Sequence, residues 1–266
     1  MNLVNEIRDT VVAPGDLAIC WLGQAGFLLK DSNGTTLAVD PYLTNCGERL
    51  RGFKRLSPML LRPEDLAPDY YVITHLHFDH FDYDAVPVVA KKSPGTRFLG
   101  PTSCQEKLEE LGISQKRRIR LDRGERYEKE DIAIQAILAD HGGMAPDAIG
   151  VLLEMGGHRL YFSGDTAFHE DLFQSVAQFR PDIAMLSVNG KFGNLNAREG
   201  ARAAELTGAK IAVPCHCWTF AEHGGDLGEF CTALLEGERC APFCFRQGEI
   251  QMLNYSLSLL RKKETA

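Results

Sequence analysis

The sequence predicts a layered, mixed α/β fold, and three observations support this. The 266 residues are 44% hydrophobic and 24% charged, which is typical of globular domains and excludes disordered, collagen-like and coiled-coil chains. No internal repeat, low-complexity tract or Gly/Ser-rich linker divides the chain, so residues 1–266 are expected to form a single domain. Apolar runs typical of strands fill the first stretch and then alternate with helices, as in layered α/β proteins.

Runs rich in β-branched and aliphatic residues predict the strands. They span residues 17–22, 26–30, 36–40, 70–74, 96–99, 131–139, 148–155, 158–163 and 210–214, with strand returns within 243–253. In the run 131–139, Ile132, Ile134 and Ala136 alternate with residues that are also largely apolar, which indicates a strand buried on both faces. We therefore expect layers on both sides of it.

Capping signals predict three helices. Residues 102–112 begin with a Thr that Gln105 follows three positions later, as in a capping box, and end at a Gly. Residues 196–208 show the same pattern, with Glu199 three positions after the first residue and a closing Gly. A third helix is expected over residues 226–236.

The segment 73–82 concentrates metal-ligand chemistry. It reads Ile-Thr-His-Leu-His-Phe-Asp-His-Phe-Asp and places His75, His77, Asp79 and His80 within six residues, directly after an apolar strand. Imidazole and carboxylate groups are the usual ligands of Zn²⁺ and similar divalent ions. An isolated His is more often a surface or hydrogen-bonded core residue, but four ligand-type side chains at this spacing favour a metal site.

Three further candidates each follow an apolar strand, where loops gather at one edge of a layered fold. They are His141, Asp165 and His216. Taken singly, Asp165 could cap a helix after Thr166, and His216 could be a hydrogen-bonded core residue. Taken together with the segment 73–82, they favour a metal site.

This His-x-His-x-Asp-His run, followed by a distant His, an Asp and a last His, resembles the signature of the metallo-β-lactamase superfamily. The resemblance implies a four-layer αββα sandwich and two divalent metal ions per chain. It assigns His75, His77 and His141 to the first ion, Asp79, His80 and His216 to the second, and Asp165 as a bridge between them. Zn²⁺, Mn²⁺ and Fe²⁺ all accept mixed His and carboxylate ligands, and of these we expect Zn²⁺, with Mn²⁺ as the second choice.

Within the superfamily, the chain is similar to the group that contains L-ascorbate-6-phosphate lactonase. The similar stretches are residues 12–15, 21–27, 39–43, 53–56 and 189–196. This resemblance implies a metal-dependent hydrolase that opens a sugar-acid lactone by attack of a metal-bridging hydroxide, with catalytic roles for Asp79 and Asp165. Proton transfer by Asp165 to the departing ring oxygen fits this chemistry.

Two other readings of the metal site stay open. A dinuclear centre also suits a phosphodiesterase acting on a nucleotide, a phospholipid or RNA. A non-catalytic protein stabilised by its metal ions is the third reading, although structural zinc sites usually have only four ligands.

Several residues are candidates for contacts around the metal site. Asp40, at a strand end, could orient a metal-bound imidazole or could simply form a turn before Pro41. The basic segment 48–62 suits a phosphorylated substrate, and Lys54 and Arg55 are the candidates to bind it. A solvated surface loop is an equally good explanation of the segment. Lys191 and Asn194, in a Gly-rich loop, could bind an anion or belong to a plain connection.

Charge and composition limit the partners. The net charge of −7 argues against nucleic acid and favours small-molecule substrates. No apolar stretch reaches the roughly 20 residues of a membrane helix, and no export signal is recognisable. The eight cysteines are read as reduced thiols of a cytoplasmic protein, and Cys215 and Cys217 as buried thiols rather than a zinc knuckle. The family resemblance leaves a homo-oligomer open.

Overall fold

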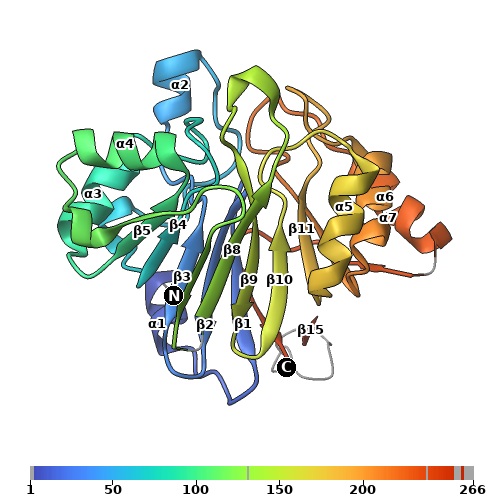
Figure 1. Cartoon of the computed structure of the whole chain (residues 1–266), viewed down its shortest axis with the longest axis horizontal. Helices are drawn as coiled ribbons and strands as arrows, with labels where there is room; N and C mark the ends of the chain where they lie inside the picture. Colours follow the sequence, from blue (N-terminus) through green and yellow to red (C-terminus); the bar gives the residue numbers. More distant parts are fainter. Residues whose placement is uncertain (1–2, 131, 238, 255–258, 261–266) are drawn as a thin grey trace.

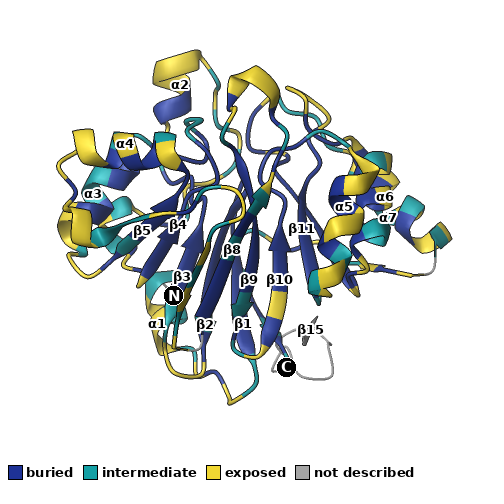
Figure 2. Ribbon diagram, viewed as in Figure 1, coloured by how far each residue is buried: buried dark blue, intermediate teal, exposed yellow. Residues whose placement is uncertain are grey.

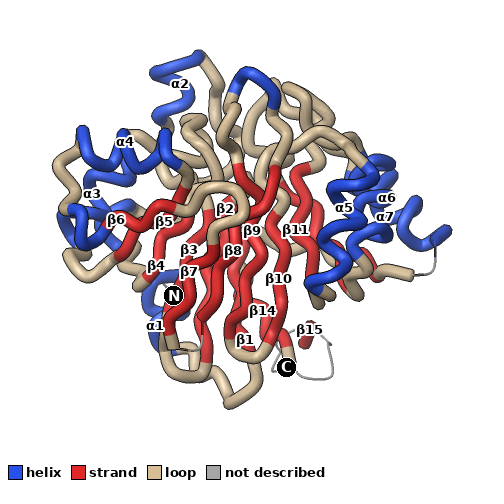
Figure 3. The backbone as a smooth tube through the Cα atoms, in the orientation of Figure 1, coloured by secondary structure: helices blue, strands red, loops and turns tan. Residues whose placement is uncertain are grey.

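The computed structural model describes residues 3–130, 132–237, 239–254 and 259–260. Two β-sheets pack face to face in the centre, and helices cover the outer face of each sheet (Figure 1; Figure 3). The layers follow the order helix, sheet, sheet, helix. The predicted mixed α/β fold and the αββα sandwich implied by the resemblance are therefore confirmed.

The first sheet has eight strands in the order β15-β14-β1-β2-β3-β4-β5-β6. Its strands are β1 (Leu17–Gly23), β2 (Gly26–Asp31), β3 (Thr36–Val39), β4 (Tyr70–Val72), β5 (Arg97–Gly100), β6 (Arg118–Arg120), β14 (Ile250–Leu253) and β15 (Leu259–Leu260). The strands β3 to β6 run parallel, whereas β14, β1 and β2 join the sheet through antiparallel pairs.

The second sheet has seven strands in the order β13-β12-β11-β10-β9-β8-β7. Its strands are β7 (Arg126–Lys129), β8 (Ile132–Leu138), β9 (Ile149–Met155), β10 (His158–Phe162), β11 (Ile183–Ser187), β12 (Ile211–Cys215) and β13 (Ala241–Pro242). It is antiparallel from β7 to β10 and parallel from β10 to β13.

Seven α-helices lie in the described part of the chain. They are α1 (Leu3–Asp9), α2 (Cys46–Arg51), α3 (Ala85–Lys92), α4 (Thr102–Glu110), α5 (Glu170–Val176), α6 (Ala197–Thr207) and α7 (Leu227–Gly237). The helices α3 and α4 cover the first sheet, and α5, α6 and α7 cover the second (Figure 1). None of these helices combines the length and the hydropathy that a membrane crossing requires.

The apolar side chains form three layers of core that match the four layers of backbone. One cluster fills the space between the two sheets, a second lies under α3 and α4, and a third under α5, α6 and α7. Most strands are accordingly buried, whereas the edge strands β6 and β7 and the outer helix faces are partly exposed (Figure 2). This arrangement fixes both sheets relative to one another. The strand β8 is buried on the face towards the other sheet, but Gln135 and Ile137 on its opposite face are only partly buried, so the burial expected on both faces is incomplete.

The strands β3, β4, β8, β10 and β12 all end at the same edge of the sandwich, the edge on which α2 lies (Figure 1). In open α/β sheets, ligands bind outside the carboxyl ends of the strands. The loops at this edge carry every metal-ligand candidate of the sequence.

The structure corrects several local predictions. The strand predicted over 36–40 ends at Val39 because Asp40 adopts a positive φ of 42°, which a β-ladder cannot accommodate. The capping box predicted at Thr102 does not form, because the Thr102 hydroxyl donates to Asp122 at 2.8 Å and Gln105 donates to the carbonyls of two other residues. In contrast, the predicted box at Asn196 and Glu199 is present.

Several elements have no counterpart in the sequence prediction, among them α1, α2, α3, β11, β13 and β15. The strand predicted over 131–139 begins at Ile132, and its residue Asp131 lies outside the described part of the chain. The helices α1 and α2 are single short segments of seven and six residues, too short for apolar periodicity to reveal.

Candidate metal centre

The metal-ligand candidates come from both sheets. The segment after β4 carries His75, His77, Asp79 and His80, and its backbone turns sharply because the amides of His80 and Phe81 both donate to the His77 carbonyl. The second sheet supplies His141, Asp165 and His216 beyond the ends of β8, β10 and β12. The site therefore forms where the two sheets meet, at the edge described above.

Close backbone packing brings Asp165 into this position. Gly164 precedes it with a positive φ of 59°, and a Cβ atom at Gly164 would lie 2.6 Å from the Ile149 carbonyl and 3.4 Å from the Thr74 Cβ. Only glycine fits this approach between the sheets. The Ser-Gly-Asp sequence thus holds the Asp165 carboxylate against the segment after β4.

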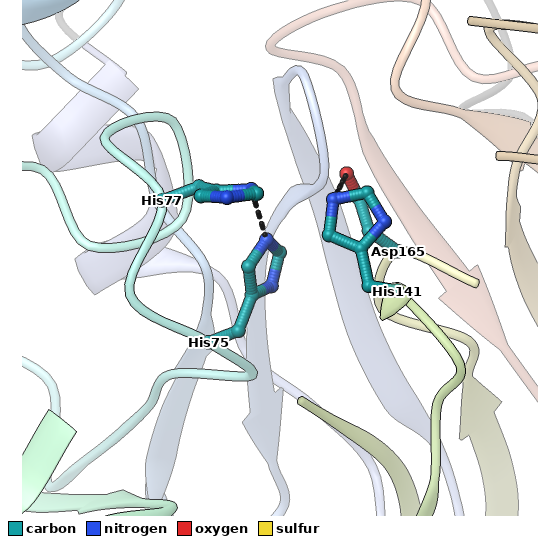
Figure 4. A group of neighbouring side chains, drawn as sticks. All are labelled: His75, His77, His141 and Asp165. Carbon is teal, nitrogen blue, oxygen red and sulfur yellow. Dashed lines mark hydrogen bonds and ion pairs between the residues drawn. The ribbon is translucent and has the colours of Figure 1, made fainter. Parts of the chain in front are cut away.

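Four side chains form a first group of potential metal ligands: His75, His77, His141 and Asp165, whose ligand atoms all lie within 4.8 Å of one another (Figure 4). The His75 Nε2 atom is 3.0 Å from His77 Nδ1, and His141 Nε2 is 3.7 Å from Asp165 Oδ2. His75 and His77 approach from the segment after β4, and His141 and Asp165 from the second sheet. Their ligand atoms converge on one small volume.

A second group consists of Asp79, His80 and His216. The Nε2 atoms of His80 and His216 are 3.0 Å apart, and His216 Nε2 is 3.1 Å from Asp79 Oδ2. Asp165 joins the two groups, because its Oδ1 atom is 3.2 Å from the Nε2 atoms of both His80 and His216, while Oδ2 faces His141. The structure thus brings together all seven predicted ligands in the arrangement that the resemblance implies.

Asp40 fixes the orientation of one imidazole in this cluster. Its Oδ2 atom is 2.7 Å from His80 Nδ1 and accepts from the Thr74 hydroxyl at 2.6 Å, while Oδ1 accepts from the Thr74 amide at 2.8 Å. A carboxylate can only accept, so Nδ1 of His80 carries the proton. The lone pair of a neutral His80 is then on Nε2, the atom that faces Asp79 and Asp165.

The donor set fits a cation. The Nε2 atoms of His80 and His216 face each other and lie close to the carboxylates of Asp79 and Asp165. The oxygens of ionised carboxylates cannot donate hydrogen bonds to one another. Asp165 Oδ1 is buried without a hydrogen bond to any described residue. Such a convergence of buried lone pairs is costly unless a positive charge lies between them. Nitrogen and oxygen ligands of this kind suit Zn²⁺ and Mn²⁺.

The electrostatics of the buried groups agree with this. Burial lowers the pKa of His75, His77 and His141, which keeps these imidazoles neutral and available as ligands. Burial also opposes a charged His80, but the carboxylates of Asp165 and its neighbours raise the pKa of His80 well above its usual value. The cluster therefore attracts positive charge even in the absence of a metal ion.

Gln24 and His223 also touch the cluster, and sequence reasoning missed both. Gln24 Nε2 donates to Asp79 Oδ2 at 2.7 Å and lies 3.1 Å from His216 Nε2. The His223 ring stacks on His216 with centroids 4.8 Å apart. Gln24 belongs to the stretch 21–27, which supports only the family resemblance, and His223 follows His216 in a loop without a motif. No local signal marks either residue.

A cavity of about 820 Å³ opens onto the cluster. His77, Asp79, His141, Asp165 and His216 line one part of it. The rest of the lining includes Arg49 and Arg51 from the basic segment 48–62.

The predicted substrate-binding residues Lys54, Arg55, Lys191 and Asn194 are not among the residues that line this cavity. Arg55 is occupied elsewhere, because its guanidinium donates to the carbonyls of Tyr42 and Thr44 and stacks 4.2 Å from the centre of the Tyr42 ring. Asn194 is buried, whereas Lys54 and Lys191 are exposed. Arg49 and Arg51 are thus the basic side chains of the segment 48–62 that line the cavity.

Comparisons with known proteins agree with the site. The beta-lactamase superfamily domain matches residues 40–217, a span that includes all seven predicted ligands. A metal-dependent hydrolase of Methanosarcina mazei is 30% identical over 224 residues, which cover 81% of this chain and 89% of that protein. A protein of Shigella boydii named as a probable L-ascorbate-6-phosphate lactonase is 27% identical, covering 80% of this chain and 73% of its own.

A solved structure shows the same fold. The metallo hydrolase Igni18 of Ignicoccus hospitalis superimposes with a TM-score of 0.73 at 20% sequence identity, covering 90% of this chain and 99% of that one. The match of the superfamily domain across most of the chain and the identity to a metal-dependent hydrolase establish the family. This protein belongs to the metallo-β-lactamase superfamily and is similar to its metal-dependent hydrolases.

Proposed function

We propose that the protein hydrolyses a lactone or another carboxylic ester with two divalent metal ions bound in the His/Asp cluster. The observation that carries this proposal is the convergence of seven buried ligand-type side chains in two adjacent groups at the mouth of one cavity. Closed structural zinc sites use four ligands, whereas this cluster has more and faces a cavity. The similarity to a protein named as a lactonase supports the ester class.

The residues divide between the two ions as the two groups suggest. His75, His77 and His141 would hold one ion, and Asp79, His80 and His216 the other, because the ligand atoms within each group lie close together. The two oxygens of Asp165 face both groups, so its carboxylate would bridge them. When bound, divalent ions of this kind lower the pKa of a water molecule towards neutrality and polarise the oxygen of the bond under attack.

The chain's own residues position the groups and move the proton. Gln24 donates to Asp79 and Asp40 accepts from His80, and these bonds hold both side chains in their orientation. Neighbouring His216 and His80 keep the pKa of Asp165 well below its usual value even though burial pushes it upwards. Asp165 is therefore an ionised carboxylate. Because so acidic a group gives up a proton readily, it would pass the proton on to the leaving alkoxide rather than keep it.

The cavity favours a neutral ester over a phosphodiester. A phosphodiester carries a permanent charge and is usually held by additional Arg or Lys side chains. Of the two arginines in the cavity, Arg49 forms an ion pair with Asp84, while Arg51 forms none with any described residue. A single free cation suits an ester with at most one anionic substituent.

Hydrolysis by the metal-loaded protein tests the proposal. The panel contains sugar-derived and simple lactones, L-ascorbate 6-phosphate, bis(p-nitrophenyl) phosphate and cyclic nucleotides, each with and without a chelator. We expect chelator-sensitive lactone opening that Asp165→Asn abolishes while the variant stays folded. Faster turnover of the phosphodiesters than of the lactones would show that the metal site hydrolyses phosphodiesters, and would refute the assignment to carboxylic esters.

A further inference from the structure

The cavity next to the His/Asp cluster has an unusually apolar wall. Outside the cluster, its uncharged lining comprises the side chains of Leu50, Phe53, Leu76, Phe78, Met144 and Phe192, together with Tyr83. Three of these, Leu50, Met144 and Phe192, are large apolar side chains that are also exposed. A large exposed apolar surface of this kind marks a binding site in a folded domain.

Aromatic rings connect this wall to the proposed metal ligands. The His223 ring stacks on His216 with centroids 4.8 Å apart, and the Phe192 centroid lies 5.7 Å from that of His223. Phe53 follows at 5.7 Å from Phe192, and Phe78 at 5.5 Å from Phe53 in an edge-to-face contact. An aromatic surface therefore begins at the cluster and extends along the cavity.

Phe192 is held in an unfavourable state. The residue is 46% exposed, and its backbone has a positive φ of 54°, a conformation that residues with a Cβ atom rarely adopt. A short polar residue would fit this loop position better, both by backbone conformation and by exposure. Phe192 thus lines the cavity while nearly half of its surface stays open to solvent.

The same wall offers few partners for hydroxyl groups. The Tyr83 hydroxyl already donates to the Leu76 carbonyl at 2.9 Å, and Arg49 is paired with Asp84. A polyhydroxylated sugar bound here would find Arg51 as a charged donor but would otherwise exchange water for apolar neighbours, so most of its hydroxyls would stay unsatisfied. A flat apolar ring, in contrast, gains from burial and from edge-to-face contacts with the phenylalanines.

We propose that the substrate carries an aromatic or similarly flat apolar ring beside its reacting ester, and that this ring packs against Phe53, Phe192 and His223. The inference rests on the proposed ester hydrolysis and specifies its substrate class. It replaces the phosphorylated sugar lactone expected from the sequence with an arylated lactone or ester. Phe192 is the specificity-determining residue, because it is exposed, lines the cavity and contacts the rings of both Phe53 and His223.

Three lactones with the same five-membered ring test the inference in the metal-loaded protein. They are γ-butyrolactone, its phenyl-substituted derivative and a polyhydroxylated sugar γ-lactone. We expect kcat/KM to be about 10- to 100-fold higher for the phenyl derivative than for the other two. Phe192→Ala should lower kcat/KM for the phenyl derivative about tenfold and leave the other two unchanged. Leu235→Ala removes another exposed apolar side chain, which lies on α7 outside the cavity, and should change none of them.

A binding measurement separates this inference from the proposed function. The phenyl-substituted γ-lactam has the shape of the lactone but resists hydrolysis, so calorimetry reports its binding without turnover. We expect it to bind the wild-type protein and to bind Phe192→Ala about tenfold more weakly. Equal turnover of all three lactones, unaffected by Phe192→Ala, would overturn the inference and leave the hydrolase intact. If no lactone is turned over, the proposed function fails, and absence of lactam binding would overturn the inference as well.

Discussion

Replacing Asp40 with Asn tests how the protein orients a metal-binding imidazole. Asp40 is buried and accepts three hydrogen bonds, from the amide and the hydroxyl of Thr74 and from His80 Nδ1. In Asp40→Asn, Oδ1 can keep the bond to the Thr74 amide, and an Asn amide group can still pair with the hydroxyl. The His80 bond cannot survive in its present form, because an NH₂ group would face an N–H group.

The expected effect is a change of tautomer. To accept from the new amide, His80 must release its Nδ1 proton and carry a proton on Nε2, the atom 3.2 Å from Asp165 Oδ1 and 3.0 Å from His216 Nε2. That proton occupies the lone pair with which His80 would bind a metal ion. Loss of such a supporting partner typically weakens metal binding about 10- to 100-fold. Loss of one hydrogen bond to a charged group also costs about 1.5 to 3 kcal/mol of stability.

Asp69 supplies a matched control. It accepts from the amide and the hydroxyl of Thr36 at 2.8 and 2.9 Å, the same pair of bonds that Asp40 makes with Thr74, but it is exposed and far from the cluster. Both Asn variants are titrated with Zn²⁺ against a chromophoric chelator and unfolded in urea. We expect weakened metal binding in Asp40→Asn and unchanged metal binding in Asp69→Asn. Equal metal affinity in the two variants would refute the orienting role of Asp40. Backbone strain would not explain a weaker affinity of Asp40→Asn, because Asn tolerates the positive φ of 42° that residue 40 adopts.

Four further outcomes are expected. Gln24→Leu removes the donor to Asp79 Oδ2 and should weaken Zn²⁺ binding about tenfold in the chelator competition; unchanged affinity would show that the amide is dispensable. Gly47→Ala places a Cβ atom against an aromatic ring and should lower stability by about 1 to 3 kcal/mol, seen as a lower Tm, which an unshifted Tm would contradict. Arg51→Ala should raise KM several-fold for esters with an anionic substituent and leave KM for neutral esters unchanged. A larger rise in KM in Lys54→Ala would instead show that Lys54 binds the anionic substituent. Chelation should abolish turnover while far-UV circular dichroism changes little, because three apolar cores hold the fold; collective unfolding would favour a structural role for the ions.

Local sequence patterns predicted the parts of the fold that depend on neighbouring residues. The helix 196–208 was recognisable because Asn196 and Glu199 satisfy each other's backbone groups within one turn, and its closing glycine adopts the left-handed conformation. The same reasoning failed at Thr102, whose hydroxyl bonds to Asp122 instead. That partner lies 20 residues away in the chain and only the tertiary structure brings it close.

The residue types of the candidate metal site were predictable from local sequence patterns. The spacing of His75, His77, Asp79 and His80 after a strand, and the position of the later ligands beyond other strands, follow from local rules, because strand ends gather at one edge of a sheet. The tertiary structure decided which side chains orient these ligands and which form the cavity. Gln24 meets Asp79 across 55 residues and His216 across 192, a separation that no periodicity or motif reports. The contact with Asp79 depends on how strands distant in the sequence pair within the first sheet, and the contact with His216 on how the second sheet packs against it. The metal-ligand residue types are therefore predictable from the sequence, whereas the lining of the cavity depends on the tertiary fold.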